Sequence, residues 1–147
     1  MKYGFYGSET ATSKPVSPEW QAVENPRVLY EMLRGIWCVE TCAPRLRGEW
    51  SEENVTVGQC SVTAFLAQDI FGGTVRGILR SGGNFHCYND VAGCVFDLTS
   101  EQFKGETLHY SKGDPVQDRA VHFAKEEKRL RYEMLRRLLR QRIGLEG

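Results

Sequence analysis

The sequence has no long apolar run and no excess of charge of either sign. No stretch of the 147 residues approaches the roughly 18 consecutive apolar residues of a membrane-spanning helix, and residues 1–13 lack the apolar core of a signal peptide. Nineteen basic side chains balance nineteen acidic ones, so no global field attracts nucleic acid or an anionic membrane. We therefore expect a cytoplasmic protein with no membrane and no nucleic-acid partner.

The sequence also lacks an even, closely spaced set of cysteines of the kind that forms a disulfide framework. A chain of this length can bury a sufficient core without disulfides, so we interpret its five cysteines as thiols: Cys38, Cys42, Cys60, Cys87 and Cys94. Apolar residues make up 41% and charged residues 26%, which is ordinary for a globular domain. We predict a single domain over residues 1–147, in which one of these thiols can be reactive.

Two segments have the pattern of helices. Asn25 is a good N-cap and Pro26 suits the first helical position, so the apolar spacing that follows predicts a helix over Pro26–Trp37. The second helix, Gln59–Phe71, follows Gly58 and ends at the Gly72–Gly73 pair. It has almost no polar face, which predicts a helix buried on nearly all sides.

Three short runs after this helix have the composition of strands, and they are Thr74–Arg80, Asn84–Asn89 and Cys94–Leu98. A type I turn from Asp90 to Gly93 would pair His86 with Asp97 and collect the apolar residues on the other face. A three-residue loop with a bulge would shift the register by one and place Asp97 among apolar residues. We favour the first register because register follows the buried face.

The ends of the chain are expected to differ from the middle. Residues 1–17 are predicted to be a loose arm or a short edge strand, and residues 115–143 a helical segment with a break near Glu127. The predicted fold class is therefore α+β: a buried central helix that carries Cys60, a small antiparallel sheet, and N- and C-terminal helices.

Cys60, His86 and Asp97 are candidates for a catalytic triad. Free N–H groups and the helix dipole favour a thiolate at the start of a helix, where Cys60 lies. An imidazole nearby can lower the thiol pKa and move the proton, and a carboxylate can orient that imidazole. The competing interpretation is that Cys60 is a core residue, because cysteine is often buried.

The same segment resembles the YunG-like family of small bacterial proteins over about residues 35–105. The resemblance rests on Trp50, Glu53-Asn54, Gly58-Gln-Cys-Ser-Val-Thr-Ala64, Gln68-Asp69, Phe71-Gly-Gly73, His86 to Asn89 and Asp97-Leu-Thr-Ser-Glu-Gln-Phe103. The order Cys, His, Asp is in turn similar to that of the papain-like and transglutaminase-like superfamily. That similarity implies a cysteine-bearing helix packed on an antiparallel sheet.

Matched residue by residue, the similarity makes Cys60 the nucleophile, His86 the base and Asp97 the orienting carboxylate. Gln59 and Asn54 are candidate oxyanion donors, and Tyr88 and Trp50 are candidates for the pocket lining. Two departures from the family pattern concern the pocket rim. The family usually has Tyr-Trp where this chain has Cys87-Tyr88, and Asn-Pro where it has Asn54-Val55.

Two other functions compete with catalysis. Cys38 and Cys42, together with Cys60, Cys87 or Cys94, supply enough thiolates for zinc, although no pair has the spacing of a zinc knuckle. A binding or scaffold protein of the same fold is the other alternative. Residues 117–142 carry nine basic and four acidic side chains around an apolar stripe. This pattern predicts an amphipathic helix docked on the domain and makes it a candidate homodimer contact.

The hypothesis that follows is a cysteine-dependent acyl-transfer enzyme, which hydrolyses an amide or thioester or transfers its acyl group. The substrate is an unidentified small molecule or peptide, and we expect no cofactor and no metal at the triad.

Overall fold

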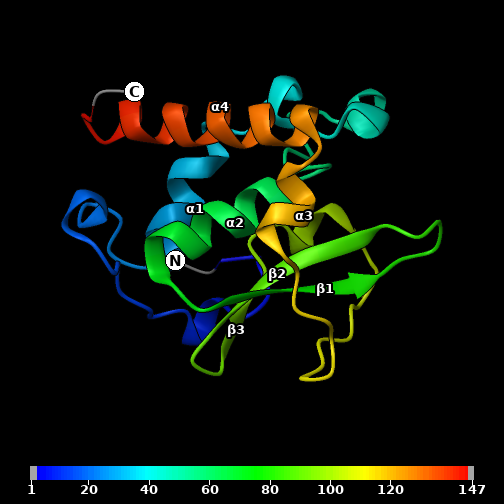
Figure 1. Cartoon of the computed structure of the whole chain (residues 1–147), viewed down its shortest axis with the longest axis horizontal. Coiled ribbons are helices and arrows are strands. Elements are labelled where there is room, and N and C mark those ends of the chain that lie inside the picture. The colour runs from blue at the N-terminus through cyan, green and yellow to red at the C-terminus, as the bar shows by residue number, and fades with distance from the viewer. Residues whose placement is uncertain (1–2, 146–147) are drawn as a thin grey trace.

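Three layers make up the structure, a computed structural model that describes residues 3–145. Helix α4 crosses over helix α2, and α2 lies on a three-stranded antiparallel sheet (Figure 1). The sheet has the order β1-β2-β3, with the strands Thr74–Leu79, Phe85–Val91 and Cys94–Phe96. The helices are α1 (Pro26–Arg34), α2 (Cys60–Phe71), α3 (Arg119–Phe123) and α4 (Glu126–Arg142). The predicted α+β class is confirmed.

Helix α2 is the centre of the core. Nine of its twelve residues are buried, because α4 covers one side of it and β2 the other. The side-chain amide of Asn89 on β2 donates to the Ala64 carbonyl of α2 at 2.9 Å, which ties the helix to the sheet. The almost wholly apolar pattern of this segment thus predicted its burial correctly. The helix begins at Cys60, with Gln59 as its N-cap residue rather than its first residue.

The other helices differ from their predicted bounds by a few residues. Asn25 caps α1 as expected, since its side chain accepts from the Val28 N–H at 3.1 Å. The helix ends at Arg34 instead of Trp37, because Gly35 follows and glycine is a poor helix former. In the C-terminal segment, α3 ends at Phe123 and α4 starts at Glu126, so the break lies just before its predicted place.

The turn between β2 and β3 differs from the predicted one. Val91 pairs with Cys94 and Asn89 with Phe96, so the loop consists of two residues, Ala92 and Gly93. Both have positive φ, 52° and 87°, which is typical of the hairpin turns that match strand twist. The predicted pairing of His86 with Asp97 is therefore wrong by two positions. A shift of two keeps every side chain on its predicted face, whereas a shift of one would not.

Segments from both ends of the chain border the sheet. Tyr6 forms a bridge with Asp97, next to β3, and Val116 forms a bridge with Arg76 of β1. Phe5 is buried in the core, and the single bridge at Tyr6 is not extended into a strand, so residues 5 and 6 pack on the domain without forming the predicted edge strand. Within residues 3–145, no helix is both long and apolar enough to cross a membrane.

Candidate active site

Cys60 is the first residue of α2, and the chain before it is tightly constrained. Gly58 has φ +71°, and a Cβ there would lie 2.5 Å from the Cys42 sulfur and 2.9 Å from the Ala43 nitrogen. The Gly58 carbonyl accepts from the Ala43 N–H at 2.9 Å. Only glycine combines the positive φ with this close approach to Cys42 and Ala43. Gly58 therefore places Cys60 at the start of the helix, with Cys42 packed behind it.

Cys60 is a partly exposed residue, and its sulfur lies 3.9 Å from the Phe85 carbonyl oxygen, at the start of β2. Gln59 makes no side-chain cap, so the first-turn N–H groups of α2 have no such acceptor at the N-cap. These groups and the helix dipole favour negative charge at this end. The position suits a thiolate and, during acyl transfer, an oxyanion.

His86 and Asp97 form a buried pair. Their side chains are 2% and 1% exposed, and the His86 Nε2 donates to the Asp97 Oδ2 at 2.6 Å. This assigns the Nε2 hydrogen and leaves Nδ1 as the ring nitrogen available to Cys60. A carboxylate held at this distance both fixes the ring and stabilises its protonated form.

The Asp97 carboxylate accepts four hydrogen bonds. Tyr110 donates its hydroxyl to Oδ2 at 2.6 Å, beside the bond from His86. The other oxygen, Oδ1, accepts from the Thr99 N–H at 3.2 Å and from the Thr99 hydroxyl at 3.3 Å. Tyr110 is in turn stacked on Tyr6, with ring centroids 3.9 Å apart. Burial, and then the charge of Asp97, raise the pKa of the Tyr110 hydroxyl, so it stays a donor.

The ionisation of Cys60 and His86 is linked. A hydrogen bond from Cys87, together with the hydrogen bond and charge of His86, lowers the pKa of Cys60 well below its usual range despite burial. Burial alone would lower the pKa of His86, but the charge and hydrogen bond of Asp97, with Cys60, raise it to about 10. The hydrogen bond to Cys60 and burial raise the pKa of Cys87. Near neutral pH the arrangement therefore favours a Cys60 thiolate beside a His86 imidazolium.

Gln102 lies between the helix start and the imidazole. Its Oε1 accepts from the Gly58 N–H at 3.4 Å, and its Nε2 lies 3.4 Å from the His86 Nδ1. The sequence suggests a capping box from Thr99 to Gln102, but no side-chain cap forms in the short helical turn there. Thr99 bonds to Asp97 instead, so both residues belong to the surroundings of the site.

A cavity of about 420 Å³ lies next to the site. Phe103 lines it, and the Phe103 ring also packs edge-on against His86 at a centroid distance of 4.7 Å. Asn54, a predicted oxyanion donor, is part of the lining. The charged lining residues have both signs, and they are Arg34, Lys104, Glu52, Glu53 and Glu101.

The other predicted site residues are held by neighbours of their own. The Gln59 amide nitrogen donates to the Cys38 carbonyl at 3.0 Å, while its Oε1 is buried without a partner. Trp50 donates from its indole nitrogen to the Val55 carbonyl at 3.0 Å. Tyr88 is buried on β2 and donates its hydroxyl to Asp114 at 2.6 Å. Their roles as oxyanion donor or pocket wall stay predictions.

Among residues 3–145, no group of three or more His, Cys, Asp or Glu side chains is arranged to hold a metal ion. The sulfurs have local partners instead. Cys94 donates to the Thr10 carbonyl at 2.9 Å, and Cys42 donates to the Ala43 carbonyl at 3.4 Å.

Fold and site together define a class: an α+β protein in which a cysteine opens a central helix beside a buried His–Asp pair. The sequence profile of the family described as YunG protein matches residues 25–144, so this chain belongs to that family. The expected resemblance to it is confirmed.

The chain is also similar to a protein of Bacillus subtilis (strain 168) described as "Uncharacterized protein YunG". The two are 48% identical over 56 residues, which cover 38% of this chain and 48% of that protein. The match thus spans about half of the curated relative's length. No solved structure matches this chain significantly.

Proposed function

We propose that this protein is a cysteine-dependent acyl-transfer enzyme that uses Cys60, His86 and Asp97. The observation that carries the proposal is the buried 2.6 Å hydrogen bond between His86 and Asp97, which leaves the second ring nitrogen for a thiol at a helix N-terminus. The linked pKa shifts of Cys60 and His86 support it. The proposed arrangement is of the papain-like or transglutaminase-like type.

In the proposed reaction, the Cys60 thiolate attacks the carbonyl carbon of an amide or thioester. First-turn N–H groups of α2 stabilise the oxyanion. The His86 imidazolium then gives its Nδ1 proton to the leaving amine or thiol, and an acyl-cysteine remains. Neutral His86 next takes a proton from water or another acceptor as it attacks the thioester, which releases the acyl group and restores the thiolate. Asp97 holds the ring in one tautomer throughout.

The charged cavity beside Phe103 supports a polar substrate with groups of both signs. It also favours the alternative of a non-catalytic binding protein of this fold, because neither Cys60 nor His86 is among its lining residues. The five thiols form no disulfide, which supports the proposed cytoplasmic location. The half-exposed Leu130 on the basic helix α4 supports the proposed homodimer contact.

The test is alkylation with iodoacetamide at pH 6, with each cysteine followed by mass spectrometry. The Cys60 thiolate is expected to react first, and His86→Ala is expected to slow Cys60 by more than tenfold, since the thiol pKa then returns toward about 8.5. Cys94→Ser is the matched control for the rate at Cys60. Cys94 is also partly buried, but it lies on β3 away from His86. Equal and slow labelling of all five thiols would contradict the proposal.

A further inference from the structure

A second polar cluster lies near Cys60, on the side formed by α3 and the start of α4. The Lys128 ammonium donates to His122 Nδ1 at 2.9 Å, and His122 Nε2 donates to the Gln117 side-chain oxygen at 2.9 Å. An ammonium has no acceptor, so Nδ1 must accept and Nε2 must carry the hydrogen. The imidazole is therefore neutral, and burial together with the charge of Lys128 lowers the pKa of His122 to about 4.

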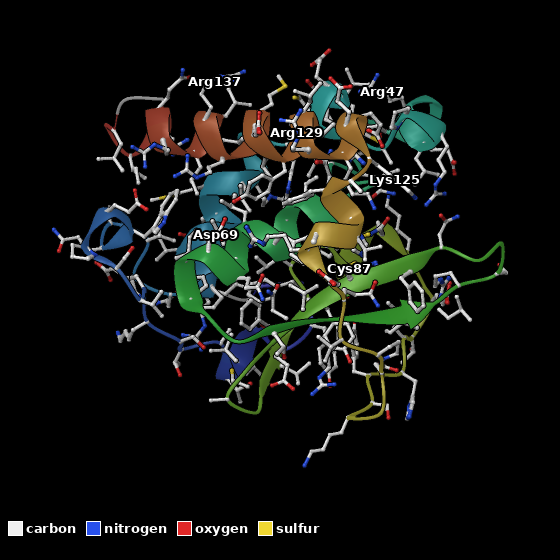
Figure 2. All side chains as sticks on the ribbon, in the orientation of Figure 1. Arg47, Asp69, Cys87, Lys125, Arg129 and Arg137 are labelled. Carbon is white, nitrogen blue, oxygen red and sulfur yellow. The ribbon has the colours of Figure 1, made fainter. Side chains whose placement is uncertain are left out.

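Packing places this cluster against both elements that hold the Cys60 sulfur. The His122 ring packs edge-on against Phe65 of α2, with centroids 5.1 Å apart. The Gln117 amide nitrogen and the Phe85 ring both crowd the open side of Gly77, where a Cβ would lie 2.6 Å and 2.9 Å from them. Phe85 is the residue whose carbonyl faces the Cys60 sulfur. Cys87 follows on β2, and Figure 2 marks it there, with Lys125 between α3 and α4.

Lys128 is a partly buried cation with a neutral partner. In the described part of the chain, no carboxylate forms an ion pair with it, whereas the neighbouring Arg131 is paired with Glu127 at 2.6 Å. Burial lowers the pKa of Lys128, the single negative charge of the linked thiols Cys87 and Cys60 opposes this, and Lys125 and Arg131 add repulsion. Buried charges in proteins are normally paired, and two of the three ammonium hydrogens are not used by His122.

We propose that Lys128, anchored by His122, binds a carboxylate of the substrate close to the acyl carbon that Cys60 attacks. The substrate class is then an amide or thioester that carries an anionic group near its reacting carbonyl. This inference rests on the proposed function of Cys60 and adds the specificity of the same site. Lys128 positions the bound substrate before the reaction, and His86 carries out the proton transfers.

Iodoacetate and iodoacetamide test this directly. In both reagents a thiolate attacks the CH2 carbon and displaces iodide, but only iodoacetate is an anion. The measured quantity is the ratio of the two rate constants at Cys60. Lys128→Met is expected to lower this ratio about fivefold, which corresponds to roughly 1 kcal/mol for a partly exposed ion pair. Lys125→Met removes an exposed charge three residues before Lys128 and is the matched control, expected to leave the ratio unchanged.

Lys128→Arg keeps the charge and is expected to keep the ratio. If Lys128→Met does not fold, salt dependence of the parent protein replaces it, because screening must lower the rate with iodoacetate more than the rate with iodoacetamide. A ratio that is unchanged in Lys128→Met, with both rates reduced equally, would show that Lys128 only stabilises the thiolate and would overturn the inference. Failure of the proposed function looks different, since neither reagent would then prefer Cys60 to the other thiols.

Discussion

Replacing Asp97 by asparagine removes the charge of the buried pair and keeps the shape of the side chain. The carboxylate accepts from four donors: His86 Nε2, the Tyr110 hydroxyl, and the N–H and hydroxyl of Thr99. An asparagine has one acceptor oxygen. Whichever way it is turned, its NH2 group therefore faces either the pair of donors at Oδ2 or the pair at Oδ1.

The expected cost follows from these bonds. Breaking a buried ion pair costs about 3–5 kcal/mol when a charge is left unpaired, but His86 can release its proton, which relieves that part of the cost. The unsatisfied donors remain and cost about 1–3 kcal/mol each, less where a hydroxyl can rotate. We expect Asp97→Asn to lower the free energy of unfolding by about 3 kcal/mol.

Two measurements check this expectation. Urea unfolding followed by tryptophan fluorescence at pH 7 gives the loss of stability, and thiolate absorbance during a pH titration gives the ionisation of Cys60. Without the carboxylate, burial lowers the pKa of His86, so the apparent pKa of Cys60 should rise toward about 8.5. Asp118→Asn is the matched control, because Asp118 is an exposed N-cap and asparagine caps equally well. A stability within about 0.5 kcal/mol of the parent and an unchanged titration would refute the reasoning.

Two further predictions concern the surroundings of the site. Tyr110→Phe removes one donor from Asp97 and should lower the free energy of unfolding, measured by urea denaturation, by about 1 kcal/mol. Tyr6→Phe keeps the stacked ring and should change this free energy little. Equal effects of the two substitutions would contradict the assigned role of Tyr110. The pKa of His122 is about 4 in the folded protein and about 6.5 when unfolded. The unfolded chain thus binds more protons between these values, so stability is lost as the pH falls through this window. His122→Gln should flatten that loss in urea titrations at pH 4 to 7, and an equally steep loss would count against the assigned tautomer.

Periodic patterns were sufficient to predict the elements that carry the site. The helix that begins at Cys60 is apolar on all sides, and burial between two layers is the only stable place for such a segment. The faces of β2 and β3 were likewise predictable from the alternation of apolar residues. The structure brings His86 and Asp97 into contact on the face expected for them, whereas their catalytic roles stay a prediction.

The exact register and the outer partners of Asp97 were not predictable in the same way. Ala92 has a positive φ, which a residue with a Cβ rarely adopts, so the composition of the turn favoured a different loop. Tyr110 lies in an irregular stretch where no periodic pattern places a side chain. Its contact with Asp97 depends on how that stretch folds back over the sheet. Thr99 did carry a local signal, since a hydroxyl two residues after an aspartate can reach its carboxylate.

The enclosure of α2 determines the direction from which a reacting molecule can reach the sulfur. The flanks of the helix face α4 on one side and β2 on the other, and nine of its twelve residues are buried, while Cys60 at its tip is a partly exposed residue. In the proposed reaction, an acyl group that approaches the sulfur from this end of the helix would present its oxygen to the amide hydrogens of the first turn.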